Sequence, residues 1–156
     1  MVKLGNFFGR NTIKNLTEQH LKPGAVIFMK CNFTTPPKMK YLLVASCEPK
    51  FLVLVINSEI NNFIRCREEL LQCQVDIPAV DHPFLCHDSF VNCVDTYAAF
   101  NLSDIKSQII DSYAEIYKGR LRDYCIRNVI EAVSESPSME PRHMKMITGS
   151  LSSVLK

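Results

Sequence analysis

The sequence predicts an α+β fold in which a small barrel or strongly bent sheet comes first and helices follow. Short apolar and β-branched runs fill residues 21–102, prolines and turn residues separate them, and a helical period of apolar residues begins at residue 103. About five or six short strands in such a stretch are typical of a small barrel. We therefore expect an N-terminal helical segment at 1–20, the barrel at 21–102 and about three helices at 103–156.

The composition is that of a globular protein. The chain has 156 residues, of which 47% are apolar and 22% are charged, so global disorder is excluded. We find neither a run of the ~20 apolar residues that a membrane helix needs nor a signal-peptide core, and we expect a cytoplasmic protein without a membrane partner. The odd count of seven cysteines favours reduced thiols that fill apolar positions.

The elements before residue 103 follow from local patterns. Asn11 is a suitable cap for a short helix that carries Ile13 and Leu16, and a Pro-Gly turn at 23–24 ends that segment. Arg67–Gln72 fits a helical turn. The expected strands share short length and β-branched or aromatic residues: Ala25–Phe33, Tyr41–Ser46, Phe51–Ile56, Ile60–Cys66, Cys73–Ile77, Phe90–Val94 and Thr96–Phe100.

Two of these strands form the most specific local prediction. Tyr41–Ser46 and Phe51–Ile56 are almost continuously apolar, which is typical of strands buried on both faces. The turn Glu48-Pro49-Lys50 is too short for a parallel crossover, so we expect an antiparallel hairpin. The loop Thr34–Lys40 contains two prolines and cannot continue the preceding strand.

The last third of the chain carries helical periodicity. Ser103 is a suitable N-cap, and the first helix continues through an apolar stripe to a C′ glycine at Gly119. A second helix begins at about Leu121 and a third after Ser138, with Pro141 in its first turn. The stripe of the first helix consists of Ile105, Ile109, Tyr113 and Ile116. Mixed charges on the later helices favour an αα-hairpin packed on the barrel over a DNA-reading helix-turn-helix.

The densest polar cluster spans residues 81–89. It contains His82, His87 and Asp88, which can act as general acid, general base or nucleophile partner. The alternative is structural, with Asp88 accepting backbone N–H groups in a turn. Zinc is a further alternative, since Cys86 and Cys93 lie close to the two histidines and Cys66 and Cys73 repeat their spacing of seven.

The motifs of common cofactor and metal sites are missing from the sequence. It has no C-x₂₋₄-C knuckle, phosphate-binding glycine loop, HExxH or G-x-S-x-G elbow, so we expect neither a metal nor a cofactor.

Charge is uneven along the chain. Residues 1–50 carry a net charge of +6, residues 51–102 carry −5 and residues 103–156 carry +1. The basic first third favours an anionic partner, unless folding mixes the two signs on one surface.

Three segments carry a resemblance to a known family. Lys22–Ile27, Tyr41–Ser46 and Phe51–Ser58 occur in the order of its Pro-Gly strand, its "ALVLS"-like strand and its Pro-Ile-Thr-like strand end. Over residues 21–105 the chain thus resembles the MazF/PemK-like toxin family. The resemblance implies an SH3-like barrel, a homodimer, and a metal-independent endoribonuclease that acts on single-stranded RNA and is held in check by an antitoxin.

The resemblance also implies where the site lies. Lys38 or Lys40 stands where the family commonly has Arg, and Ser58 stands where it has Thr. Lysine cannot make the bidentate phosphate contact of arginine, and the family's acidic residue after the glycine is Ala25 here. The candidate catalytic residues are therefore Lys38, Lys40, Ser58, His82, His87 and Asp88. A barrel that lost this chemistry and serves as a protein-interaction or nucleic-acid-binding module is the alternative.

Overall fold

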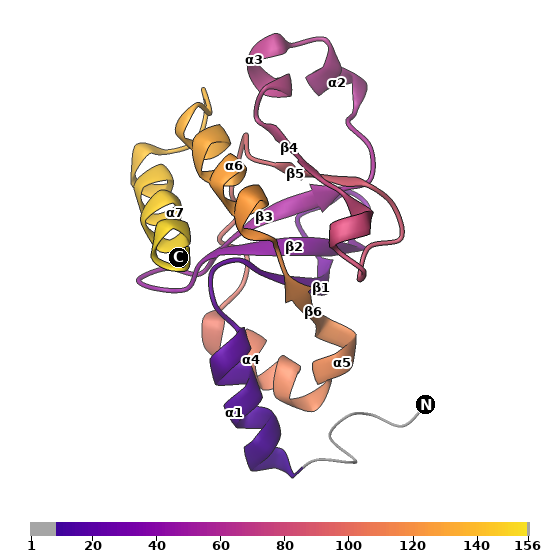
Figure 1. Ribbon diagram of the computed structural model, residues 1–156, viewed down its shortest axis with the longest axis vertical. Coiled ribbons are helices and arrows are strands. Elements are labelled where there is room, and N and C mark those ends of the chain that lie inside the picture. The colour runs from indigo at the N-terminus through magenta and orange to yellow at the C-terminus, as the bar shows by residue number, and fades with distance from the viewer. Residues whose placement is uncertain (1–8, 156) are drawn as a thin grey trace.

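The computed structural model describes residues 9–155, and within them a curled six-stranded antiparallel sheet forms an open half-barrel (Figure 1). The strand order is β4-β5-β3-β2-β1-β6. The strands are β1 (Ala25–Cys31), β2 (Lys38–Ser46), β3 (Leu52–Asn57), β4 (Gln74–Ile77), β5 (Ser89–Asn92) and β6 (Tyr117–Arg120). The helices are α1 (Arg10–His20), α2 (Asn62–Arg65), α3 (Glu68–Leu71), α4 (Leu102–Asp111), α5 (Tyr113–Ile116), α6 (Asp123–Ser134) and α7 (Pro141–Ser153). The mixed α+β class is confirmed.

Strands β1, β2 and β3 form the centre of the sheet as an antiparallel meander, which confirms the predicted hairpin. Leu42 and Val44 of β2 point into one hydrophobic cluster and Leu43 and Ala45 point into the other, so β2 is buried on both faces as predicted. The continuous apolar sequence of this strand is therefore explained by a layer of helices on each side of the sheet.

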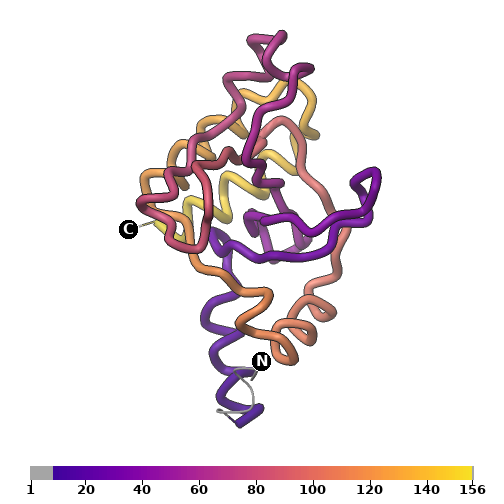
Figure 2. The backbone as a smooth tube through the Cα atoms, turned by 90° about the vertical axis from the view of Figure 1, so that its right-hand side faces the viewer, coloured from indigo at the N-terminus to yellow at the C-terminus, as the bar shows by residue number. Residues whose placement is uncertain are grey.

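The two faces of the sheet are covered by helices from different parts of the chain. Apolar side chains of α6 and α7 pack on the face that contains Leu43, and those of α4 pack on the face that contains Leu42. Helices α6 and α7 also pack against each other, as the αα-hairpin prediction requires, and α1 packs on α4. Figures 1 and 2 show α2 and α3 at one end of the molecule and α1, α4 and α5 at the opposite end.

Strand β6 was not predicted. The segment Tyr117–Arg120 was expected to end a helix, with Gly119 as its C′ residue, but it pairs with β1 at the sheet edge. The helix stops earlier, at Asp111, and is followed by the single turn of α5. The predicted division at residues 20 and 102 stays a prediction, although β6 shows that residues after 102 contribute a strand to the sheet.

Gly119 fits its place in β6 because it has no side chain. A Cβ atom there would lie 2.8 Å from Cδ1 of Phe84, and the residue has a φ of +156°. The absence of a side chain lets the β6 backbone lie directly against the Phe84 ring. The contact joins the sheet edge to the loop that precedes β5.

Three further local predictions are wrong. Ile60–Cys66 was expected as a strand, but the Asn61 side chain accepts a hydrogen bond from the Ile64 N–H at 2.9 Å and caps α2. Thr96–Phe100 forms only an isolated bridge between Tyr97 and Val53. The N-cap of α4 is Asn101 instead of Ser103.

Within the segment predicted as helical at 1–20, the described residues form α1, with Ile13 buried and Leu16 partly buried, and residues 1–8 lie outside the described range. Its N-cap is Gly9 instead of Asn11. Within residues 9–155, no helix has the length and apolar character needed to cross a membrane.

Candidate nucleic-acid interface

Four of the six predicted site residues line one groove of about 330 Å³. Lys38 and Lys40 come from the start of β2, Ser58 follows β3, and His87 belongs to the loop before β5. These positions come together because β2 lies beside β3, and β3 pairs with β5. None of the described residues that line the groove is acidic. The groove is therefore suited to an anionic ligand.

A network around Thr34 orders the loop that leads to Lys38. The Thr34 hydroxyl lies 3.0 Å from the Cys31 carbonyl and 2.9 Å from the Pro36 carbonyl, and it accepts the Lys38 N–H at 3.1 Å. The proline-containing loop thus returns the chain to the sheet at a defined point. The Lys38 side chain is exposed and forms no ion pair with any described residue.

Lys40 is the more constrained of the two cations. Its ammonium donates a hydrogen bond of 2.7 Å to Oδ1 of Asn57, the last residue of β3. Burial lowers the pKa of Lys40, and the positive charge of Lys38 lowers it further. An ammonium with a lowered pKa releases its proton more readily than an ordinary lysine.

His87 and Ser58 lie on the wall of the groove, and both are exposed. The carbonyl of His87 accepts a hydrogen bond of 3.0 Å from the Ser89 hydroxyl, which fixes the backbone where β5 begins. The imidazole of His87 has no hydrogen bond to another described residue and is free to meet a ligand.

His82 and Asp88 are not among the residues that line the groove. His82 is fully buried, with Nδ1 at 2.8 Å from the Pro78 carbonyl and Nε2 at 3.2 Å from the Arg122 N–H. Asp88 accepts the Ala79 N–H at 2.9 Å, in agreement with the structural alternative for this residue. Both side chains therefore hold the loop 78–88 in place.

Sequence reasoning missed two aromatic residues of the groove, Phe28 of β1 and Tyr41 of β2. They are cross-strand partners with ring centroids 4.7 Å apart, and the Tyr41 hydroxyl donates a 3.2 Å hydrogen bond to the Phe84 carbonyl. Both were recognised as strand residues, but their meeting depends on the β1–β2 register. The two rings are tilted by 43° to each other, and each offers a face on which a base can stack.

The zinc alternative lacks a ligand cluster. Within residues 9–155, no group of three or more His, Cys, Asp or Glu side chains is placed to hold a metal ion. Cys73 and Cys93 are buried, and Cys66 and Cys86 are exposed. Burial raises the pKa of the Cys73 and Cys93 thiols, which agrees with the apolar interpretation of these two residues.

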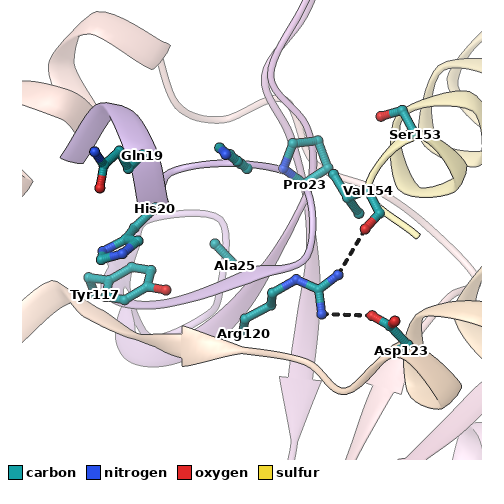
Figure 3. A pocket seen from close by; sticks show the side chains of 10 residues that line it. Gln19, His20, Pro23, Ala25, Tyr117, Arg120, Asp123, Ser153 and Val154 are labelled. Atoms are coloured by element: carbon teal, nitrogen blue, oxygen red, sulfur yellow. Dashed lines mark hydrogen bonds and ion pairs between the residues drawn. The ribbon is translucent and has the colours of Figure 1, made fainter. Parts of the chain in front are cut away.

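A larger cavity of about 560 Å³ lies between α1, β6 and the end of α7 (Figure 3). The Arg120 guanidinium in its lining donates hydrogen bonds to Asp123 at 2.8 Å and to the Val154 carbonyl at 3.1 Å. His20 stacks on Tyr117 in the same cavity. These groups are already engaged with one another, so they tie together the elements around the cavity.

Comparison of the chain with models of protein families, with curated proteins and with solved structures finds no match.

Proposed function

We propose that the chain is a MazF/PemK-like protein with an SH3-like barrel, and that it is a metal-independent endoribonuclease acting on single-stranded RNA. The observation that carries the proposal is the gathering of Lys38, Lys40, Ser58 and His87 in one groove whose described lining contains no acidic residue. Metal-independent cleavage of RNA needs a base for the 2′-hydroxyl, an acid for the leaving oxygen and cations for the phosphate. The groove contains side chains suited to each of these tasks.

In the proposed reaction, His87 takes the proton of a 2′-hydroxyl group, and the 2′-oxygen bonds to the adjacent phosphorus. The bond from phosphorus to the 5′-oxygen breaks, and Lys40 gives a proton to that oxygen. Lys38 holds the phosphate as a point charge, and the Ser58 hydroxyl donates a hydrogen bond to it. The products are a 2′,3′-cyclic phosphate and a 5′-hydroxyl, and proton exchange with water restores His87 and Lys40.

The proposed setting is a toxin–antitoxin or phage-defence system in the cytoplasm, where cellular RNA is the substrate. A groove with two lysines and no described acidic residue also suits an acidic antitoxin segment that competes with RNA. We include a homodimer in the proposal, as the family resemblance implies.

One observation favours a second function, a non-catalytic nucleic-acid-binding or interaction module. Lys40 is hydrogen-bonded to Asn57, and Asp88 and His82 are hydrogen-bonded to backbone groups. His87 is then the only described imidazole or carboxylate side chain that lines the groove. In this alternative the groove binds RNA and leaves it intact.

The test is incubation of the purified protein with a mixed-sequence single-stranded RNA in EDTA. The proposal expects fragments ending in a 2′,3′-cyclic phosphate, and it expects His87→Ala to lower the cleavage rate at least a hundredfold. His20→Ala is the matched control, because His20 is exposed but lines the other cavity. Intact RNA at high protein concentration, together with measurable binding, would select the non-catalytic alternative.

A further inference from the structure

Phe28 lies at the margin of the hydrophobic core that the described residues form. Phe28 is half-buried, yet it belongs to neither hydrophobic cluster, whereas its neighbour Val26 on the same face of β1 is buried among α6 and α7 residues. Its ring contacts Tyr41 and lines the groove. A phenylalanine placed in this way leaves apolar ring surface for a ligand.

A third cation lies beside this ring. The Lys118 ammonium of β6 is 5.8 Å from the Phe28 ring centroid, at the outer limit of a cation–π contact. Its hydrogen bond to the Ala114 carbonyl measures 3.3 Å, which is longer than the roughly 2.7–3.2 Å typical of an N–H···O hydrogen bond. Both interactions are weak, so the Lys118 ammonium can leave them to pair with a phosphate oxygen.

The route from Lys118 to the groove is continuous across the sheet. β6 pairs with β1 and β1 pairs with β2, so Lys118, Phe28 and Tyr41 lie on three adjacent strands. Phe28 and Tyr41 line the groove together with Lys38. A nucleic-acid strand bound at the lysines of β2 can therefore continue toward β6, where it meets first the Phe28 ring and then the Lys118 ammonium.

We propose that Phe28 and Lys118 form a subsite for one unpaired nucleotide next to the reacting phosphate. The base stacks on the Phe28 ring and the Lys118 ammonium pairs with the phosphate of that nucleotide. The inference rests on the proposed RNA site and gives a reason for its single-stranded substrate, because a base held within a duplex cannot stack on a protein ring. It also gives β6, which lies outside the range of the family resemblance, a part in binding.

The experiment measures binding of a six-nucleotide 2′-O-methyl RNA, which lacks the free 2′-hydroxyl and cannot be cleaved. We expect Phe28→Leu to weaken binding about tenfold, since the leucine keeps an apolar side chain but offers no ring. We expect Lys118→Ala to reduce the slope of log affinity against log salt by about 0.7, the value for one phosphate contact on a single strand. Lys118→Arg keeps the charge and is expected to preserve the slope.

Lys50→Ala is the matched control, because Lys50 is an exposed lysine in the β2–β3 turn, at the far end of β2 from Lys38. Unchanged affinity in Phe28→Leu and an unchanged salt slope in Lys118→Ala, with RNA cleavage intact in the wild type, overturn the subsite and leave the proposed function standing. If the wild type binds RNA without cleaving it, and both variants bind as expected, the subsite is supported and the nuclease is overturned. A wild-type protein that neither binds nor cleaves overturns both.

Discussion

Nε2 of His82 lies 3.2 Å from the backbone nitrogen of Arg122, which is 40 residues later in the chain. The opposite ring nitrogen lies 2.8 Å from the Pro78 carbonyl. Nε2 therefore accepts a hydrogen bond from the Arg122 N–H, and the N–H at Nδ1 donates a hydrogen bond to the Pro78 carbonyl. The imidazole joins the start of the loop 78–88, which also contains His87, to the residue that precedes α6.

We expect His82→Ala to reduce the free energy of unfolding by about 2–4 kcal/mol. The substitution leaves an N–H and a carbonyl without their partner and opens a cavity in a buried place. Urea unfolding followed by circular dichroism measures the change.

His87→Ala is the control for this loop, because His87 is exposed, and we expect a change within about 0.5 kcal/mol. If His82→Ala unfolds like the wild type but has lost RNA cleavage, the structural role is wrong and His82 belongs to the chemistry.

Local sequence patterns predict the β2–β3 hairpin but not strand β6. The β2–β3 hairpin follows from two continuous apolar runs and a short turn, and the structure has it. Tyr117–Arg120 contains two cations and a glycine, which locally indicate a helix end, and it becomes a strand because β1 offers it an edge. Such long-range pairing leaves no periodic signal in four residues.

Some residues of the groove were predictable from the sequence, and others depend on contacts between distant segments. The family resemblance made Lys38, Lys40 and Ser58 candidates, the polar cluster at 81–89 made His87 one, and all four line one groove. Phe28 was not a candidate, because its meeting with Tyr41 depends on a register set by the loop between their strands. The burial of His82 depends on the backbone of Arg122, so the local sequence could not distinguish a buried histidine from a catalytic one.

We expect Gly119→Ala to destabilise the protein by about 1–3 kcal/mol, since the new Cβ atom would lie 2.8 Å from the Phe84 ring. Gly149→Ala is the matched control. Gly149 lies in α7 with nothing within 4 Å of its added Cβ, so the alanine stabilises the helix by about 0.5–1 kcal/mol. In urea unfolding, we expect the midpoint to fall in Gly119→Ala and to rise in Gly149→Ala. Equal shifts in both variants would contradict the close approach of β6 to Phe84.

Lys40 makes RNA binding sensitive to alkaline pH. Because burial and Lys38 lower its pKa, the Lys40 ammonium loses its charge at a lower pH than an ordinary lysine, and binding of 2′-O-methyl RNA weakens as pH rises through that pKa. Lys38→Ala removes a like charge, so the pKa of Lys40 rises and the loss of binding moves to higher pH. Fluorescence anisotropy between pH 7 and 10.5 measures the shift. We expect Lys50→Ala to leave the pH midpoint of RNA binding unchanged. An unchanged pH midpoint in Lys38→Ala as well would show that the charge of Lys38 does not affect the titration of Lys40.

Two exposed cysteines allow the groove to be located directly. Cys86 lines the groove, whereas Cys66 follows α2 and does not, and both thiols are exposed. We expect iodoacetamide at pH 7.5 to modify these two residues first, because burial raises the pKa of the other described thiols, that of Cys47 to about 11. Saturating 2′-O-methyl RNA is then expected to slow modification of Cys86 at least fivefold and to leave Cys66 unchanged, as measured by peptide mass spectrometry. Equal rates at Cys86 with and without the oligonucleotide would place the RNA elsewhere on the molecule.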